Sequence, residues 1–229
     1  MDRVALITGG TGALGRACVD LFLEDGWRVA VPVHHSAEGL RDAAERHGDR
    51  LTSFPADLTT AEGADGAVER TMAWGARLDA VVHTVGGYAG SGLLHEAPVD
   101  EWDRMMDINL RSAYLVARAA LPPLSRDGSL VFVSSRTALK ARKGHAAYAV
   151  SKAALIALVE AIAEEQKGRA RANVVLPGTI DTAANRATFE DAKSASWTPP
   201  EEIARVILFL ASSASAPVSG AAVPVYGDS

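Results

Sequence analysis

The stretch that decides the fold is Val4-Ala5-Leu6-Ile7-Thr8-Gly9-Gly10-Thr11-Gly12-Ala13-Leu14-Gly15. Its apolar start predicts a buried strand, its glycines predict a sharp turn, and the amphipathic pattern that follows predicts a helix. Glycines let the backbone turn tightly and approach a phosphate without an intervening Cβ. The N-terminus of a helix then offers free N–H groups to an anion. A tight turn without any ligand has the same composition, but its place at the first strand–helix junction favours a dinucleotide-binding turn.

Outward from this stretch, short β-branched runs alternate with helical patterns. The runs are apolar without clean alternation, which is typical of strands covered on both faces. The predicted strands are Val4–Ile7, Arg28–Val33, Leu51–Phe54, Leu78–Val82, Leu130–Val133, Ala172–Leu176 and Ala221–Val225. The predicted helices are Ala13–Glu24, Ala37–His47, Ala61–Trp74, Val99–Leu121, Ala146–Lys167 and Pro200–Ser212. This order predicts an α/β fold: a Rossmann-like, doubly wound parallel sheet of about seven strands with helices on both faces.

The length and composition are those of one domain. We expect residues 1–229 to form a single dinucleotide-binding domain, with an irregular substrate-binding flap at 178–198. The net charge is −5 and no Lys/Arg block stands out, so we expect no nucleic-acid partner. The uninterrupted apolar runs are short and no secretory signal opens the chain, which predicts a cytoplasmic protein without a membrane partner. The single cysteine, Cys18, is interpreted as a small buried hydrophobic residue.

Tyr148 and Lys152 stand at positions i and i+4 of a predicted helix, on one face. A free tyrosine has a pKa of about 10, and a nearby ammonium is expected to lower it. The pair is therefore a candidate acid/base device, although the same spacing occurs by chance on surface helices. Ser135 ends the fifth strand thirteen residues before Tyr148. Its hydroxyl could donate to a substrate oxygen that becomes negative, or it could cap the segment that follows.

The sixth strand ends in Leu176-Pro177-Gly178-Thr179-Ile180-Asp181-Thr182. An ordinary turn would have this composition. The functional interpretation is a backbone ledge that holds a nicotinamide carboxamide.

These motifs, in this order, resemble the short-chain dehydrogenase/reductase family in its compact single-domain branch, over nearly the whole chain. The resemblance implies an NAD(P)(H)-dependent oxidoreductase that moves a hydride between nicotinamide and a small carbonyl or alcohol. Tyr148 would be the general acid/base, Lys152 would hold the nicotinamide ribose, and Ser135 would polarise the carbonyl. Asn109 would support a proton-relay water. The implied cofactor-binding residues are Gly9, Thr11, Gly12, Ala13, Leu14, Gly15, His34, His35, Ser36, Asp57, Leu58, Thr84, Val85, Gly86, Tyr148, Lys152, Pro177, Gly178, Ile180 and Thr182.

The sequence departs from the family pattern in two places. Ala13 replaces the middle glycine of the first turn, and the usual Asn-Asn-Ala-Gly after strand four is His83-Thr84-Val85-Gly86. Gly-Ala-Leu-Gly and Gly-Gly-Tyr-Ala-Gly are locally similar to dihydropteridine reductases, which raises a pterin- or quinone-type substrate as an alternative. His83 has no second His or carboxylate nearby at the spacing of metal ligands. We therefore predict no metal site and a packing role for His83.

The residue that would accept from a ribose 2′-OH should end strand two, and Val33 stands there. Without a carboxylate to repel a 2′-phosphate, and with His34, His35 and Ser36 as donors, NADP(H) is favoured over NAD(H). The same segment resembles that of NADP-using pteridine reductases. Two observations oppose NADP(H): no Arg or Lys stands immediately after strand two, and neutral histidine binds phosphate more weakly than these residues do.

The expected substrate is small, because the flap leaves no room for a further domain. Candidate substrate contacts are Tyr88, Ser135, Tyr148 and Trp197, whereas Trp102 has the helical spacing of a core residue with Met105 and Met106. No basic cluster demands a phosphorylated or polyanionic substrate. The helix of Tyr148 has two apolar stripes, which predicts a homodimer or homotetramer.

Two rival classes remain. A non-catalytic dinucleotide sensor should lack the serine, tyrosine or lysine, and all three are present. A nucleotide-sugar epimerase or dehydratase usually carries a larger C-terminal region. The family's enoyl reductases space tyrosine and lysine more widely than here.

Overall fold

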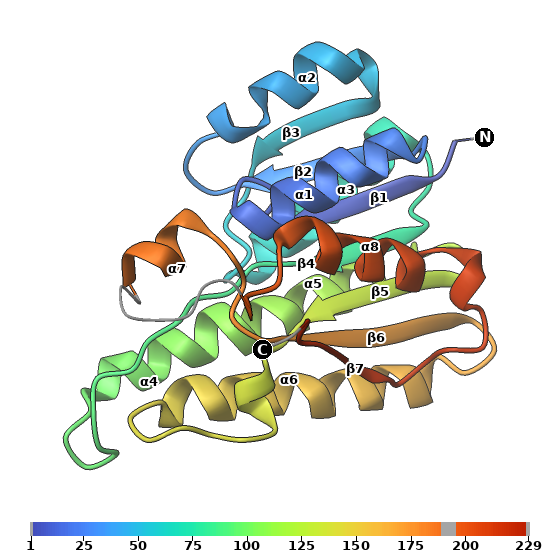
Figure 1. The fold of residues 1–229 in the computed structure, drawn as a ribbon. Coiled ribbons are helices and arrows are strands. Elements are labelled where there is room, and N and C mark those ends of the chain that lie inside the picture. The colour runs from blue at the N-terminus through green and yellow to red at the C-terminus, as the bar shows by residue number, and fades with distance from the viewer. Residues whose placement is uncertain (1, 189–195, 228–229) are drawn as a thin grey trace.

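The computed structural model describes residues 2–188 and 196–227 and contains one sheet of seven parallel strands (Figure 1). The strand order is β3-β2-β1-β4-β5-β6-β7. The strands are β1 (Val4–Thr8), β2 (Arg28–Val33), β3 (Leu51–Pro55), β4 (Ala80–His83), β5 (Gly128–Val133), β6 (Ala170–Pro177) and β7 (Ala222–Val225). Five of them, β1, β2, β4, β5 and β6, are buried almost throughout, as their unbroken apolar runs require. The predicted fold class is confirmed.

Helices cover both faces of the sheet, and the sheet divides the hydrophobic core into two layers (Figure 1). On one face lie α1 (Ala13–Glu24), α2 (Arg41–His47) and α8 (Pro200–Ala211). On the other lie α3 (Ala61–Gly75), α5 (Ser112–Ala120) and α6 (Ala146–Glu165). By length and composition alone, α6 is apolar enough to cross a membrane. Its residues Leu155, Val159 and Ile162 belong to the core against the sheet, so packing accounts for much of that apolarity.

The strand order reverses at β1, which pairs with β2 on one side and β4 on the other. The helical connections after β1 and β4 therefore leave the sheet on opposite faces, α1 on one and α5 on the other. A crevice opens at the carboxyl ends of these two strands. In Figure 1 the strand arrowheads point to this edge, where the start of α6 and the short helix α7 (Ala183–Thr188) also lie. Ligands of open α/β sheets bind at such an edge.

The long helix predicted over Val99–Leu121 is present from Val99 to Ala120, and it contains a π-helical turn that the sequence did not predict. It consists of α4 (Val99–Met106), a π-helical segment (Asp107–Arg111) and α5. A π-helical turn accommodates one extra residue, and such turns are frequent at functional sites. Asn109 lies within it and is buried. Propensity and periodicity predict a helix here but do not reveal an insertion of one residue.

Three further expectations need correction. The second helix begins at Arg41, after a 3-10 turn over Glu38–Leu40, rather than at Ala37. The 178–198 segment is not wholly irregular, because it contains α7 and a parallel bridge between Ile180 and Thr198; residues 189–195 lie outside the described part. Trp102 is 39% exposed, so only Met105 of its predicted core stripe is fully buried.

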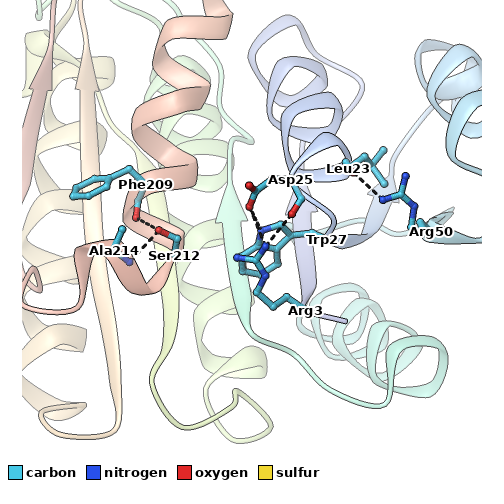
Figure 2. Close-up of polar contacts among 8 residues, drawn as sticks. All are labelled: Arg3, Leu23, Asp25, Trp27, Arg50, Phe209, Ser212 and Ala214. Carbon is cyan, nitrogen blue, oxygen red and sulfur yellow. Dashed lines mark hydrogen bonds and ion pairs between the residues drawn. The ribbon is translucent and has the colours of Figure 1, made fainter. Parts of the chain in front are cut away.

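Polar contacts hold the ends of α1 and α8 at the edge opposite the crevice (Figure 2). Asp25, just after α1, accepts hydrogen bonds from Arg3 and from the indole N–H of Trp27. The guanidinium of Arg3 also lies over the Trp27 ring, 4.4 Å from its centroid. At the end of α8, Ser212 donates to the Phe209 carbonyl at 2.9 Å. These contacts anchor the far ends of two helices whose other ends border the crevice.

Candidate active site

A cavity of about 820 Å³ opens at the carboxyl edge of the sheet. Segments that are far apart in sequence form its wall: the start of α1, the loops after β4, β5 and β6, and the first turns of α6. All four candidate substrate residues line it: Tyr88, Ser135, Tyr148 and Trp197. Lys152 lines it as well. The phenol, the ammonium and the hydroxyl predicted to act together therefore share one cavity.

Lys152 is 5% exposed and points its ammonium at the end of β5. Its Nζ donates to the Val133 carbonyl at 2.9 Å, while its own carbonyl accepts from the Ser134 hydroxyl at 2.8 Å. Burial disfavours the charged form and lowers the pKa of Lys152 to about 8. One strand end thus fixes both the backbone and the head group of this lysine.

Tyr148 does not have the lowered pKa expected from its spacing to Lys152. Burial raises the pKa of Tyr148 above its ordinary value, and a hydrogen bond with Ser135 lowers it by less. The ammonium of Lys152 is not among the groups that shift it. The physical reason is that burial outweighs the hydrogen bond, while Lys152 donates to Val133. This arrangement keeps the phenol protonated at neutral pH.

Ser135 has the capping role that its sequence position allowed, and its hydroxyl also lies beside Tyr148. It precedes the 3-10 turn Arg136–Ala138, and its Oγ accepts the N–H of Thr137 at 3.1 Å, which caps that turn. The same hydroxyl is hydrogen-bonded to Tyr148. Capping fixes the hydroxyl beside the phenol, so both groups face one point of the cavity.

Asn109 holds the loop that follows β4. Its Oδ1 accepts from Gly87 N at 2.9 Å, and its Nδ2 donates to the Gly87 carbonyl at 3.1 Å and to the Ser151 hydroxyl at 3.1 Å. A Cβ on neighbouring Gly86 would lie 2.9 Å from Asn109 Oδ1 and 3.0 Å from Lys152 Nζ. Only a glycine leaves this approach open, so Gly86, Asn109 and Lys152 surround one point of the site.

The glycine turn before α1 fits the pyrophosphate of a dinucleotide. Gly12 is the N-cap of α1 and no side chain caps the helix, so the N–H groups of its first turn have no side-chain acceptor. A Cβ on Gly15 would lie 2.0 Å from the Gly9 carbonyl oxygen, whereas a Cβ on exposed Gly12 would contact only that oxygen at 3.4 Å. Gly15 therefore serves turn packing, and Gly12 leaves the helix end open to an anion. Ala13 and Thr11 flank Gly12, while Leu14 also lines the cavity.

The ends of β2 and β3 border the other end of the crevice. His34, His35 and Ser36 are exposed, and His34 Nδ1 lies 3.1 Å from His35 Nε2. Asp57 accepts from the Thr59 hydroxyl at 2.7 Å, and hydrogen bonds from Thr59 lower its pKa, with a smaller effect from nearby His34. Leu58 is buried beside it. Hydrogen-bond donors therefore follow β2, and the Asp57 carboxylate follows β3.

Residues after β4 and β6 complete the predicted cofactor wall. Thr84 donates to the Thr8 carbonyl at 2.8 Å and lines the cavity with Gly86, whereas Val85 packs partly buried against the core. Pro177, Gly178 and Ile180 also line the cavity. Thr182 accepts the N–H of Asn185 at 3.1 Å and so lies at the start of α7.

His83 has the packing role predicted for it. It is 1% exposed, hydrogen-bonds to Thr8 and Ser112, and burial lowers its pKa to about 3. Cys18 is fully buried, and burial raises its pKa to about 12, so its thiol is an inert core group.

Sequence reasoning missed the basic residues of the cavity. Arg136, Lys140, Arg142 and His145 line it, all from the loop between Ser135 and Tyr148. Tyr88 and His145 are hydrogen-bonded, and the Tyr88 ring lies edge-on to Tyr148 with centroids 5.2 Å apart. Sequence reasoning did not single out this basic segment. The signal was available, because Arg136–His145 contains four Lys or Arg residues and no carboxylate.

The burial of Lys152 predicts a pH dependence of folding. A lysine has a pKa of about 10.4 when unfolded, against about 8 in this structure, so the unfolded chain binds the extra proton between these values. Lys152 should therefore contribute a rise of about 3 kcal/mol to the free energy of unfolding over that window, which the Cys18 thiol partly offsets above about pH 8.5, because its pKa is raised to about 12 in the folded chain. Urea unfolding of the cofactor-free protein between about pH 7 and about pH 10 measures it.

The matched comparison is Lys152→Met, which should lack this rise. Tyr148 does not interfere, because its raised pKa removes stability only above about pH 10. Parallel pH curves for the two proteins would contradict the assignment.

A doubly wound sheet, a glycine turn at its first strand–helix junction and a Ser–Tyr–Lys cluster at its carboxyl edge define a dinucleotide-binding oxidoreductase. A family model described as enoyl-(acyl carrier protein) reductase matches residues 10–227. The chain belongs to the short-chain dehydrogenase/reductase family, whose members use a nicotinamide cofactor.

Known relatives match over almost the whole chain. The 2-(R)-hydroxypropyl-CoM dehydrogenase of Xanthobacter autotrophicus is 31% identical, covering 99% of this chain and 98% of that protein. The 3-oxoacyl-(acyl-carrier-protein) reductase FabG of Thermotoga maritima is 30% identical, covering 98% and 96%. A solved structure of a blue fluorescent protein from a metagenomic library, in complex with NADPH, is 29% identical, covers 99% and 97%, and has a TM-score of 0.88.

Proposed function

We propose that this protein reduces a small carbonyl compound with NADPH, and that Tyr148 supplies the proton. The observation that carries the proposal is the convergence of Ser135, Tyr148 and Lys152 on one cavity at the carboxyl edge of the sheet. The glycine turn at the start of α1 opens onto the same crevice. A bound nicotinamide supplies the hydride; the chain supplies binding, orientation and the proton.

Each side chain has a distinct task in this mechanism. Ser135 donates a hydrogen bond to the carbonyl oxygen and stabilises the negative charge that develops there. Tyr148 transfers its phenolic proton to that oxygen, and its raised pKa keeps the proton available at neutral pH. Lys152, whose ammonium lies at the end of β5, would hold the nicotinamide ribose. Asn109 fixes the loop after β4, against which the cofactor lies.

The relatives support carbonyl chemistry. One is named for dehydrogenation of a 2-hydroxypropyl compound and the other for reduction of a 3-oxoacyl group. The family model carries an enoyl reductase description, but here tyrosine and lysine are only four residues apart, on one turn of α6. A pterin or quinone reductase of the same fold would use the same residues and is an outcome of the test.

The test has two stages. Fluorescence titration with NADPH and NADH measures cofactor affinity, and a panel of ketones, aldehydes, quinones and pterins then follows cofactor oxidation at 340 nm. We expect turnover of at least one ketone or aldehyde. Cofactor binding without turnover of any of these would favour the non-catalytic sensor and would overturn the proposal.

A preference for NADPH over NADH is part of the proposal, and Val33→Asp tests it. Val33 ends β2 beside the exposed donors His34, His35 and Ser36. A carboxylate there would repel a 2′-phosphate and accept from a ribose 2′-OH. We expect the ratio of NADPH to NADH affinity to fall by about tenfold or more, which corresponds to about 1.4 kcal/mol. Titration of both cofactors against both proteins measures the ratio.

Val33→Asn is the matched control, because asparagine has nearly the same shape as aspartate but carries no charge. It should retain most of the NADPH preference. Equal ratios in the wild type and the Asp variant would remove the charge argument.

We also propose that the protein forms a homodimer or homotetramer. Tyr114 on α5 is 50% exposed and Val150 on α6 is 44% exposed, so the two helices carry apolar side chains at the surface. An isologous pairing of these helices would bury both. Light scattering at micromolar concentration should give a mass at least twice that of the chain, and a monomer would contradict the pairing.

A further inference from the structure

We propose that the loop Arg136–His145, here called the basic loop, recognises an anionic group on the substrate, such as a carboxylate or a phosphate. The inference rests on the proposed function, since it places the substrate in the same cavity as Tyr148. The basic loop connects Ser135 to the first turn of α6, so it borders the reacting groups on both sides.

Three cationic side chains of the basic loop line the cavity: Arg136, Lys140 and Arg142. No Asp or Glu is among the described residues that line it. Arg136 also lies over the Tyr226 ring, 4.9 Å from its centroid, which leaves Lys140 and Arg142 as the cations to test. Neither has a carboxylate within ion-pair distance in residues 2–188 and 196–227.

The positive charge of the basic loop acts on the pKa of a tyrosine that lines the cavity. Arg142 acts on the Tyr88 hydroxyl and lowers its pKa, against the larger effect of burial and ahead of the opposite effect of Glu101. Tyr88 lies edge-on to Tyr148 and is hydrogen-bonded to His145 of the same loop. An anion near Arg142 would therefore lie next to the residues that handle the carbonyl oxygen.

The end of the basic loop, at Gly144 and His145, packs against the segment after β4. Gly144 has a φ of +85°, and the position of its Cβ faces Gly92 at 3.5 Å. A Cβ on Gly90 would lie 2.5 Å from the His145 ring, so the two segments are closely packed. This packing fixes the end of the basic loop next to Tyr88, while Lys140 and Arg142 themselves are exposed and can reach a ligand in the cavity.

The phosphates of the cofactor do not account for these cations. The pyrophosphate site is at the start of α1 and the 2′-phosphate site is at the end of β2. The basic loop follows β5, which is three strand spacings from β2, or about 14 Å. It therefore flanks the nicotinamide and substrate half of the crevice, where its charge is available to the substrate.

Binding to the NADP⁺-loaded protein tests this without needing turnover, because oxidised cofactor and a ketone form an unreactive pair. Calorimetry would measure the dissociation constants of 2-oxopropanoate, 3-oxobutanoate and 4-oxopentanoate, each beside its methyl ester. A further arm compares dihydroxyacetone phosphate with dihydroxyacetone and so separates phosphate from carboxylate. We expect at least one anion to bind about tenfold more tightly than its neutral partner, as charge-assisted hydrogen bonds require.

The double variant Lys140→Gln/Arg142→Gln should abolish this preference without changing NADP⁺ affinity. Lys143→Gln is the matched control, because Lys143 belongs to the same loop but does not line the cavity, and it should retain the preference. Raising the salt concentration should weaken the binding of each anionic ketone but not that of its neutral partner, since exposed charges are screened.

The outcomes separate the two proposals. NADP⁺ binding with no preference for any anion over its neutral partner, or a preference that survives the double variant, overturns this inference alone. Failure to bind NADP⁺ overturns the proposed function and this inference with it.

Discussion

Replacing Tyr148 with Phe should lower turnover by about 10²- to 10⁴-fold while leaving NADPH affinity unchanged. Loss of one positioned acid costs that much, because the carbonyl oxygen would have to take its proton from water. The ring of Tyr148 remains, so its edge-on packing with Tyr88 and the shape of the cavity are retained. Steady-state oxidation of NADPH and fluorescence titration measure the two quantities separately.

Tyr88→Phe is the matched control for this prediction. Tyr88 lines the same cavity and loses the same hydroxyl, but its oxygen is hydrogen-bonded to His145 rather than to Ser135. Its effect should be far smaller than that of Tyr148→Phe. Undiminished turnover by Tyr148→Phe would refute the role of Tyr148 as the acid.

The second large effect is expected for Gly15→Ala. A Cβ at this position would lie 2.0 Å from the Gly9 carbonyl oxygen and 2.8 Å from the Gly10 Cα, and both are backbone atoms. The turn must therefore shift, and overpacking of this kind costs about 1–3 kcal/mol. Because the same turn presents N–H groups to the pyrophosphate, NADPH affinity should fall by about 5- to 150-fold. Thermal unfolding and cofactor titration of the same preparation record both losses.

Gly12→Ala, in the same turn, separates packing from ligand contact. Its Cβ would meet only the Gly9 carbonyl oxygen, at 3.4 Å, and its φ of −78° suits alanine, so stability should hardly change. A fall in affinity for this variant without loss of stability would locate the phosphate at the helix N-terminus. Unchanged affinity and stability for Gly15→Ala would contradict the turn geometry.

How much of the site the sequence predicted differs from residue to residue. Ser135, Tyr148, Lys152 and Asn109 were found from motif order, because their elements have strong periodicity and fixed places along the chain. The clamp of Asn109 on Gly87 was not foreseen, since it depends on a π-helical turn that one extra residue creates. The pKa of Tyr148 was predicted in the wrong direction, because sequence spacing shows a neighbouring charge but not the depth of burial.

By itself, the sequence determined the parallel sheet, the order of its elements, the glycine turn before α1 and the candidate residues Ser135, Tyr148 and Lys152. Hydrophobic runs and glycine positions are local properties of the chain, and they specify strands, helices and turns wherever the pattern is strong. The tertiary structure alone decided which groups share a cavity: the ammonium of Lys152 bonds to β5, and Arg136, Lys140 and Arg142 line the same cavity as Tyr148. Burial and the electrostatic environment depend on atoms brought together from distant segments, so they exist only once the chain has folded.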